Sequence, residues 1–289
     1  MIKGLGTALI TPFDANGNVD YSALERLLDT QLTGFVDYIV VLGTTGEAAT
    51  MTADEKREVR RFIVNQLKIK NEKLRIPLVL GVGGNNTAAV CAELEMMKEE
   101  LVRDYAAILS VCPYYNKPNQ EGLYQQFCKV AEASPVPVLL YNVPGRTGVN
   151  LLPETVMRIY EAHPDKIVGI KEASGNLEQI KHLIELANSK FLVISGDDGI
   201  AAEVMEAGGA GLISVASNAF PEDFYKIVHE KDQVRQAKYE NMVKLLFAEG
   251  NPVGIKAVLA QKGIIQNNLR LPLVPASKEL QERIKKELA

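Results

Sequence analysis

Residues 136–143 read Val-Pro-Val-Leu-Leu-Tyr-Asn-Val, an apolar run with polar residues near its end, and a helical pattern follows it. Runs of this kind recur eight times along the chain. They are Gly4–Pro12, Tyr38–Gly43, Pro77–Gly83, Ala106–Cys112, Val136–Val143, Ile167–Ala173, Phe191–Gly196 and Gly211–Val215. The first six begin about 30 residues apart, the length of a strand, a loop, a helix and a second loop. The runs are apolar on both faces, as expected of parallel strands covered by helices.

Helix-start signals lie between these runs. Asp20 precedes an amphipathic segment, and Thr52 with Glu55 forms a capping box before a helix that reaches about Lys70. The other candidate caps and first helical positions are Asn85 or Asn86, Pro153, Asn176 and Pro221. Alternating strands and helices predict an α/β protein, and eight repeats favour a closed (β/α)8 TIM barrel. An open, doubly wound sheet is the alternative.

The pattern changes after the eighth run, where only helical periodicity follows. It covers Pro221–Glu230, Gln233–Glu249, Val253–Lys262 and Ser277–Leu288, with a connector at Asn267–Pro275. One helix completes a barrel, so the others are surplus to it. We therefore expect a barrel over residues 1–225 and a C-terminal helical region over residues 226–289. That region covers apolar surface or contributes to oligomer contacts.

The composition of the 289-residue chain excludes several classes of protein. Hydrophobic residues make up 47% of it, and the formal net charge is −4 with no block of Lys and Arg, so no nucleic-acid partner is expected. Apolar stretches such as Phe35–Leu42 are far below the roughly 18 residues needed to span a membrane. The N-terminus lacks the apolar segment of a signal peptide. We therefore expect a cytoplasmic protein.

The cysteines and histidines indicate neither a disulfide framework nor a metal site. Cys91, Cys112 and Cys128 are odd in number and form no CxxC pair, which favours ordinary thiols. The three histidines are scattered and pair neither with a Ser or Cys motif nor with carboxylates at ligand spacing. This argues against a Ser-His-Asp hydrolase and against a metal site built from histidines, so no metal is expected.

Lys171 is the first candidate for chemistry, because functional side chains of a TIM barrel lie at the C-terminal ends of its strands. Residues 167–174 read Ile-Val-Gly-Ile-Lys-Glu-Ala-Ser, which places Lys171 at such an end. Burial disfavours an ammonium ion, and a neutral amine attacks the carbonyl of a keto acid to give an imine. The alternative is a lysine that extends to the surface.

Tyr141 lies near the end of the fifth run, and Arg146 follows that run. Tyr141 lies one strand from Lys171, so its phenol can transfer protons at the imine; the alternative is a core tyrosine with a satisfied hydroxyl. Arg146 lies in a loop rich in Pro and Gly, where a surface role is the default. Its planar guanidinium nevertheless suits a substrate carboxylate.

Two segments that contain glycine are candidates for ligand binding. The second run continues as Gly-Thr-Thr-Gly-Glu, residues 43–47, where the hydroxyls of Thr44 and Thr45 and several backbone N–H groups can bind a carboxylate, although it can also be only a turn. Residues 81–86 are Gly-rich as well. However, Asn86 stands where a dinucleotide fingerprint has its third glycine, so no nicotinamide cofactor is expected.

The fourth run is followed by Tyr114 and Tyr115 between two prolines, in a loop where burial does not require them. Packing at a subunit contact is their simplest explanation.

These segments together resemble the pyruvate-dependent class I aldolase-like family of dihydrodipicolinate synthases and N-acetylneuraminate lyases. The resemblance covers nearly the whole chain. Its motifs are Gly43–Glu47, Pro113–Pro118, Tyr141–Gly148, Gly169–Ala173, Ser195–Asp198 and Gly211–Asn218. It implies a lyase of lysine and diaminopimelate biosynthesis, no cofactor beyond the covalent imine with pyruvate, and a homotetramer built as a dimer of dimers.

The resemblance also implies roles for individual residues. Lys171 would form the imine with pyruvate, and Tyr141 would donate and accept protons. Thr44 and Tyr115 would complete a proton relay, with Tyr115 contributed by the neighbouring subunit.

The substrates would be held by a second group of residues. Thr45 and the backbone of Ile213 would bind pyruvate, and Gly196 would line the mouth of the site. Arg146 would bind the carboxylate of the second substrate, aspartate semialdehyde. A polyhydroxylated sugar needs hydroxyl partners instead, so Arg146 favours the synthase over a sugar-acid lyase or another keto-acid aldolase.

The chain departs from the pattern at the positions that bind an inhibitor. Lysine-inhibited relatives typically have histidines at the positions of Ala53 and Lys56 and a glutamate at that of Ala89. Because the carboxylate that would meet an ammonium group is missing, we expect weak or absent inhibition by lysine. Gly254 also replaces a residue that is often proline, with no evident function.

Two hypotheses of other classes stay open. The first is a non-catalytic barrel that binds a small acid as a regulator, and it predicts no covalent adduct. The second is a metal-dependent barrel aldolase, which chelators would inactivate.

Overall fold

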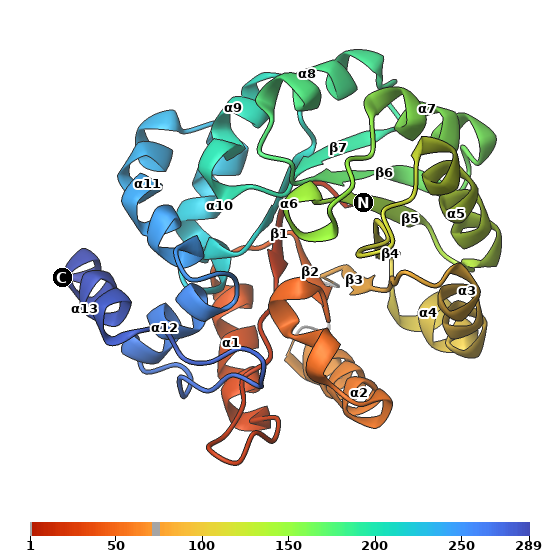
Figure 1. Cartoon of the computed structure of the whole chain (residues 1–289). Coiled ribbons are helices and arrows are strands. Elements are labelled where there is room, and N and C mark those ends of the chain that lie inside the picture. Colours follow the sequence, from red (N-terminus) through yellow and green to blue (C-terminus); the bar gives the residue numbers. More distant parts are fainter. Residues whose placement is uncertain (1, 71–75) are drawn as a thin grey trace. The chain divides into compact units, whose positions relative to one another are not determined.

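A computed structural model describes residues 2–70 and 76–289, and its strands follow the expected runs. They are β1 (Gly4–Ala8), β2 (Tyr38–Val41), β3 (Leu78–Gly81), β4 (Ala107–Val111), β5 (Val138–Asn142), β6 (Ile167–Glu172), β7 (Leu192–Ser195) and β8 (Gly211–Ser214). They succeed one another from β1 to β8 around a closed barrel (Figure 1). The expected (β/α)8 barrel is confirmed. Each strand is shorter than its apolar run, because the run continues into buried loop residues such as Leu9 and Ile10.

The helices alternate with the strands. They are α1 (Tyr21–Thr33), α2 (Ala53–Lys70), α3 (Thr87–Met96), α4 (Lys98–Asp104), α5 (Gln120–Ala133), α6 (Pro144–Thr147), α7 (Pro153–Ala162), α8 (Leu177–Leu186), α9 (Ala201–Glu206), α10 (Pro221–Glu230), α11 (Gln233–Phe247), α12 (Val253–Gln261) and α13 (Lys278–Leu288). Short 3-10 helices are η1 (Thr44–Gly46), η2 (Ala48–Thr50), η3 (Asp198–Ile200) and η4 (Ala216–Asn218). No helix of the described residues is both long and apolar enough to cross a membrane.

The predicted helix starts are confirmed. The Asp20 side chain accepts a hydrogen bond from Ala23 N, and Asn176 caps α8 in the same way. Thr52 and Glu55 form the reciprocal capping box, with bonds of 2.8 and 3.2 Å. Of the two candidates before α3, Asn86 is the cap. Pro residues begin α7 and α10, where their missing N–H groups need no partner.

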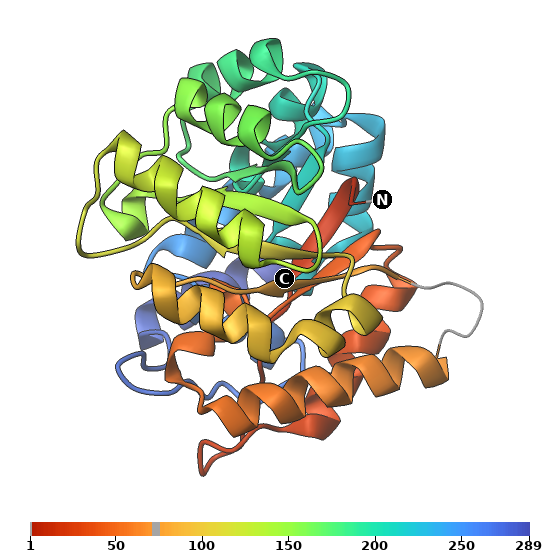
Figure 2. The same cartoon turned by 90° about the vertical axis from the view of Figure 1, so that its right-hand side faces the viewer.

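By its internal contacts the chain divides into two compact units. The first comprises Met1–Gly4 and Pro77–Ile213. Its strands pair in parallel with their neighbours from β3 onward, and β5 is buried along its whole length. On the outside, α3 packs against α5, α5 against α7, and α7 against α8 (Figure 2). This unit carries the strand ends at which Tyr141 and Lys171 were expected.

The second unit comprises Leu5–Ile76 and Ser214–Ala289. Here β1 pairs with β2, and the expected C-terminal helices are present as α10 to α13, with α11 in contact with both α12 and α13. Figure 1 shows α11 to α13 in shades of blue, and the residues just after α12 contact α1, whose Arg26 donates to the backbone oxygen of Ile264. The expected boundary near residue 225 stays a prediction.

The packing of α11 against α12 explains Gly254. A Cβ at this position would lie 2.3 Å from the backbone oxygen of Leu246. Such a distance is far below van der Waals contact, so only glycine allows the two helices to approach this closely. Gly254 is therefore a packing residue.

Candidate active site

Lys171 and Tyr141 come together at the ends of two neighbouring strands. The register of β5 and β6 pairs Tyr141 with Lys171, so both side chains point to the same face. The Nζ atom of Lys171 lies 4.4 Å from the centroid of the Tyr141 ring. Each residue is only 6% exposed. The structure thus places a buried amine over the Tyr141 ring, on the neighbouring strand where the sequence predicted this tyrosine to lie.

Gly196 makes room for this amine. It directly follows β7, which pairs with β6. A Cβ at Gly196 would lie 2.8 Å from Cε and 3.1 Å from Cγ of Lys171, and 2.6 Å from the Cβ of Ala173. Any larger residue would displace the Lys171 side chain. The next strand, β8, contains the buried Ile213.

Asn142 and Glu172 form a buried polar group next to the pair of Lys171 and Tyr141. This group was not predicted from the sequence. Asn142 directly follows Tyr141 on β5, and Glu172 directly follows Lys171 on β6. Because side chains alternate along a strand, Asn142 and Glu172 point to the face opposite to that of Tyr141 and Lys171. The amide of Asn142 donates to Glu172 Oε2 at 2.9 Å, and Ser174 N donates to the other carboxylate oxygen at 2.8 Å. Asn142 Oδ1 accepts from Leu151 N at 3.0 Å. These bonds join the ends of β5 and β6 and close the segment that carries Arg146.

The carboxyl group of Glu172 has an unusual environment. Burial raises its pKa, and the hydrogen bonds from Asn142, Ser174 and Gln179 oppose that rise because they favour the charged form. Burial likewise raises the pKa of the Cys112 thiol, with a further contribution from the charge of Glu172. Cys112 N donates to the backbone oxygen of Tyr141 at 2.9 Å. The sequence signal for the Asn142–Glu172 group is a polar residue at the end of each of two neighbouring strands, β5 and β6.

The sequence predicted an irregular loop around Arg146, and this prediction is wrong. Arg146 lies in the one-turn helix α6, and its side chain is exposed. Pro144 supplies a helical φ at the first position. Gly148 ends the turn with φ 75°, and its N–H donates to Pro144 O at 2.9 Å. The Pro and Gly that suggested a loop are therefore the start and stop of a helical turn.

Tyr115 is another predicted residue that a single chain leaves in solvent. Its side chain is 88% exposed, so it is not packed against the buried pair of Lys171 and Tyr141. Its φ of 75° is unusual for a bulky residue. The neighbouring turn is held by Asn85, whose amide donates to Tyr114 O at 3.0 Å, and by Asn116, which donates to Asn85 O.

The threonine turn follows β2 in the second unit. Thr44 and Thr45 begin η1. Thr44 is exposed, whereas Thr45 is 2% exposed and its Oγ1 accepts from Asn251 Nδ2 at 2.9 Å. Glu47 ends the turn with φ 53°, in the left-handed region. Thr44 is therefore an exposed residue, whereas the hydroxyl of Thr45 is held by a hydrogen bond.

The Gly-rich segment after β3 ends in a helix cap. Asn86 Oδ1 accepts from Ala89 N at 3.2 Å, at the position where a dinucleotide fingerprint has its third glycine. This side chain occupies one of the N–H groups that would otherwise face a phosphate. Within residues 2–70 and 76–289, no group of three or more His, Cys, Asp and Glu residues could hold a metal ion.

Comparison with known proteins gives full-length matches. The Dihydrodipicolinate synthetase family matches residues 1–289. A 4-hydroxy-tetrahydrodipicolinate synthase of Azobacteroides pseudotrichonymphae is 45% identical over 295 residues, which cover 100% of this chain and 97% of the relative. The corresponding enzyme of Parabacteroides distasonis is 45% identical over 294 residues, with 99% and 96% covered.

Solved structures agree with these matches. The crystal structure of dihydrodipicolinate synthase from Thermotoga maritima has a TM-score of 0.92 and 40% sequence identity, with 100% of this chain and 98% of that chain covered. The chloride-inhibited dihydrodipicolinate synthase from Acinetobacter baumannii, complexed with pyruvate, has a TM-score of 0.92 and 39% identity, with the same two shares covered.

Proposed function

The chain belongs to the dihydrodipicolinate synthetase family, and on that premise we propose how its residues carry out the reaction. It is an enzyme with the activity for which its relatives are named, 4-hydroxy-tetrahydrodipicolinate synthase, and acts as a lyase in lysine biosynthesis. We propose that Lys171 forms a Schiff base with pyruvate. The observation that carries this proposal is the buried Lys171 amine, 4.4 Å from the centroid of the Tyr141 ring.

The chemistry follows from the reactivity of an amine. Lys171 Nζ attacks the keto carbon of pyruvate, and loss of water gives the imine. The imine withdraws electrons, so the methyl group loses a proton and an enamine forms. The enamine carbon attacks the aldehyde carbon of aspartate 4-semialdehyde. The amine of the adduct then attacks the imine carbon, closes the ring and releases Lys171.

Tyr141 is the proposed proton donor and acceptor in these steps, with Thr44 and a neighbouring subunit's copy of Tyr115 completing the relay. The high exposure of Tyr115 in one chain supports a role across a subunit contact. Thr45 and the backbone of Ile213 are proposed to bind pyruvate. The role proposed for Gly196, at the mouth of the site, is supported by the space that it leaves for Lys171.

Trapping the imine tests this function. Borohydride reduces an imine to a stable amine, so pyruvate with borohydride is expected to add one adduct to the chain, and peptide mapping should locate it at Lys171. An adduct elsewhere, or none, contradicts the proposal; the latter supports a non-catalytic barrel. Turnover of pyruvate with aspartate semialdehyde, compared with cleavage of N-acetylneuraminate, separates the synthase from a sugar-acid lyase. Loss of activity with a chelator would indicate a metal-dependent aldolase.

Arg146→Leu is expected to raise the KM for aspartate semialdehyde by about 10- to 100-fold, the range for loss of a hydrogen bond to a charged group. The KM for pyruvate should stay within about twofold, because pyruvate is held elsewhere. Steady-state kinetics with each substrate varied measure both values. Arg158→Leu is the matched control: Arg158 is an exposed arginine paired with Glu121, and its loss should leave both constants unchanged. Equal changes in the two KM values would contradict the assignment.

Lysine is expected to inhibit weakly or not at all at millimolar concentration. Ala53 and Lys56 lie in the first turn of α2, and Ala89 lies in the first turn of α3. Because alanine and lysine side chains have no carboxylate, none of the three can pair with the ammonium group of lysine. Initial rates measured over a lysine titration test this, with norleucine, which lacks the ε-amine, as the control. Strong inhibition by lysine alone would refute the prediction.

The assembly and location of the chain are proposed as well. A homotetramer built as a dimer of dimers is supported by the exposure of Tyr114 (45%) and Tyr115 (88%), and light scattering after size-exclusion chromatography measures it. A cytoplasmic location is supported by the three free cysteines Cys91, Cys112 and Cys128. The division into a barrel over residues 1–225 and a helical region over residues 226–289 is our proposal for the domains.

A further inference from the structure

Glu47 ends the turn that begins with Thr44, and its carboxylate forms a buried ion pair with Lys256 of α12. The two side chains are 1% and 0% exposed. Glu47 Oε2 also accepts from the backbone N–H of Arg270 at 3.2 Å, and Lys256 Nζ donates to Asn268 O at 3.0 Å. The pair thus connects the threonine turn to two C-terminal segments, α12 and the connector before α13.

Stability alone does not account for this pair. Taking two charges out of water costs free energy that their attraction often fails to recover, so apolar residues of similar volume can be equally stable. A buried pair does, however, restrict each partner to one position. Glu47 needs such a restraint, because a left-handed backbone (φ 53°) is unfavourable for a residue with a side chain.

Thr45 and Gly46, the two residues before Glu47, are also held by hydrogen bonds from residues outside the turn. Thr45 Oγ1 accepts from Asn251, which lies just before α12, at 2.9 Å. The backbone oxygen of Gly46 accepts from the hydroxyl of Thr11 at 2.8 Å. Three consecutive residues of the turn, from Thr45 to Glu47, therefore each have a buried polar partner outside it, and two of these partners belong to the α12 segment.

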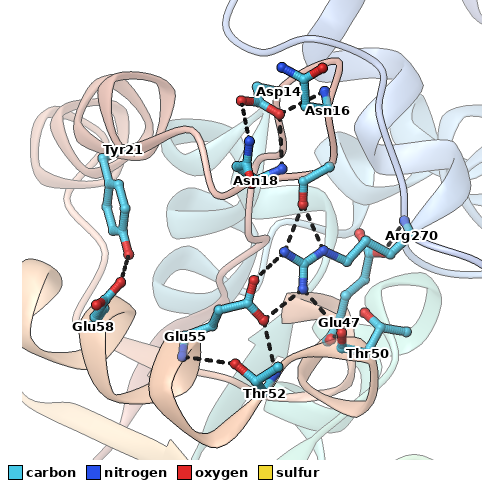
Figure 3. A network of polar contacts seen from close by, with 11 residues as sticks. Asp14, Asn16, Asn18, Tyr21, Glu47, Thr50, Thr52, Glu55, Glu58 and Arg270 are labelled. Carbon is cyan, nitrogen blue, oxygen red and sulfur yellow. Dashed lines mark hydrogen bonds and ion pairs between the residues drawn. The ribbon is translucent and has the colours of Figure 1, made fainter.

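Arg270, whose backbone N–H contacts Glu47, makes a second set of contacts through its side chain (Figure 3). Its guanidinium donates to the carboxylate of Glu55, and to the backbone oxygens of Thr50 at 3.1 Å and Gly17 at 2.7 and 2.9 Å. The hydrogen bonds from Arg270 lower the pKa of Glu55 to about 2. The Phe13 ring lies 4.2 Å from Lys256 Nζ and 4.4 Å from Arg270 Cζ, measured to its centroid.

We propose that Glu47 and Lys256 are positioning residues for keto-acid binding: their ion pair sets the geometry of the Thr44–Thr45 turn, so the C-terminal region takes part in substrate recognition. This inference rests on the proposed function, in which Thr45 binds pyruvate. Neither Glu47 nor Lys256 needs to touch the substrate. Their effect is expected in the affinity for pyruvate.

Two variants separate positioning from stability. Burial lowers the pKa of Lys256 to about 8, and Glu47 opposes that shift. Loss of Glu47 lowers that pKa further, so in Glu47→Gln at an assay pH just below 8 Lys256 is expected to lose its proton while the wild-type pair is still charged, which leaves no unpaired buried charge in the variant. The double variant Glu47→Gln with Lys256→Met removes both charges at any pH. Lys244→Met is the matched control, since Lys244 is an exposed lysine on α11 paired with Glu240.

The measurements are the steady-state KM for each substrate and the extent of imine trapping with borohydride over a pyruvate titration, with thermal melts to establish folding. In both Glu47 variants the KM and the half-trapping concentration for pyruvate are expected to rise about tenfold, as for one misaligned hydrogen bond. The KM for aspartate semialdehyde and the trapping at saturating pyruvate should stay within about twofold of wild type. Lys244→Met should match wild type.

A folded double variant with wild-type affinity for pyruvate would overturn the inference and leave the proposed function intact. So would equal losses for both substrates, or a double variant that does not fold, because either assigns the pair to stability. Absence of a trapped imine in the wild-type chain would instead overturn the proposed function, and this inference with it.

Discussion

Lys171→Arg is expected to lower turnover by at least about 10⁴-fold, the scale on which removal of a nucleophile acts in covalent enzymes. A guanidinium stays protonated at any assay pH and cannot form an imine, although it keeps the positive charge. The loss should therefore appear in kcat, together with complete loss of borohydride trapping by pyruvate. Single-turnover kinetics and mass spectrometry measure these two effects.

Two further variants make this result decisive. The Lys171 side chain lies so close to Gly196 that not even a Cβ fits between them, so Lys171→Met, which has no bulky head, tests whether the loss comes from crowding. It should be equally inactive. Lys181→Arg, at an exposed lysine of α8 paired with Glu178, is the matched control and should keep wild-type turnover. An active Lys171→Arg enzyme would refute the Schiff base and the proposed mechanism.

Much of the fold was predictable because its determinants are local. Parallel strands covered by helices must be apolar on both faces, and each helix needs an N-cap, so runs such as Val136–Val143 and caps such as Asn176 can be recognised from a few residues. The placement of Lys171 beside Tyr141 followed as well, since strand ends of neighbouring runs meet at one end of a barrel.

What could not be predicted depends on contacts distant in sequence. Asn251 meets Thr45 across 206 positions, and no periodicity in the sequence indicates that contact. The same holds for Lys256 and Glu47, each of which is an ordinary surface residue by type. The one-turn helix around Arg146 was missed for another reason: Pro and Gly favour both a loop and the two ends of a short helix.

The two buried polar groups outside the proposed catalytic pair of Lys171 and Tyr141 have a similar structural position. Asn142 with Glu172 restrains the strand ends that carry Tyr141 and Lys171, and Glu47 with its lysine partner restrains the threonine turn. A reacting atom must be held within a fraction of an ångström, which apolar packing alone does not achieve. In the mechanism that we propose, directional polar contacts behind the Lys171–Tyr141 pair and behind the threonine turn provide that restraint.

Tyr141→Phe is expected to lower kcat by about 10²- to 10⁴-fold, the usual contribution of a positioned proton donor and acceptor. The ring is what lies 4.4 Å from the Lys171 amine, so phenylalanine keeps the packing and removes only the hydroxyl. Imine formation with pyruvate should therefore persist but become slower, and the KM for pyruvate should change little. Stopped-flow kinetics and time-resolved borohydride trapping measure the two rates separately.

Tyr160→Phe is the matched control for this variant. The Tyr160 hydroxyl is hydrogen-bonded to Asn188 at about the same depth of burial, so its loss should cost about 1 kcal/mol of stability and leave kcat unchanged. A Tyr141→Phe enzyme with kcat close to wild type would contradict the proton-transfer role. Lys171 could then still form the imine, but its protons would have to move through water or another residue, because no phenol would remain at the paired position on β5.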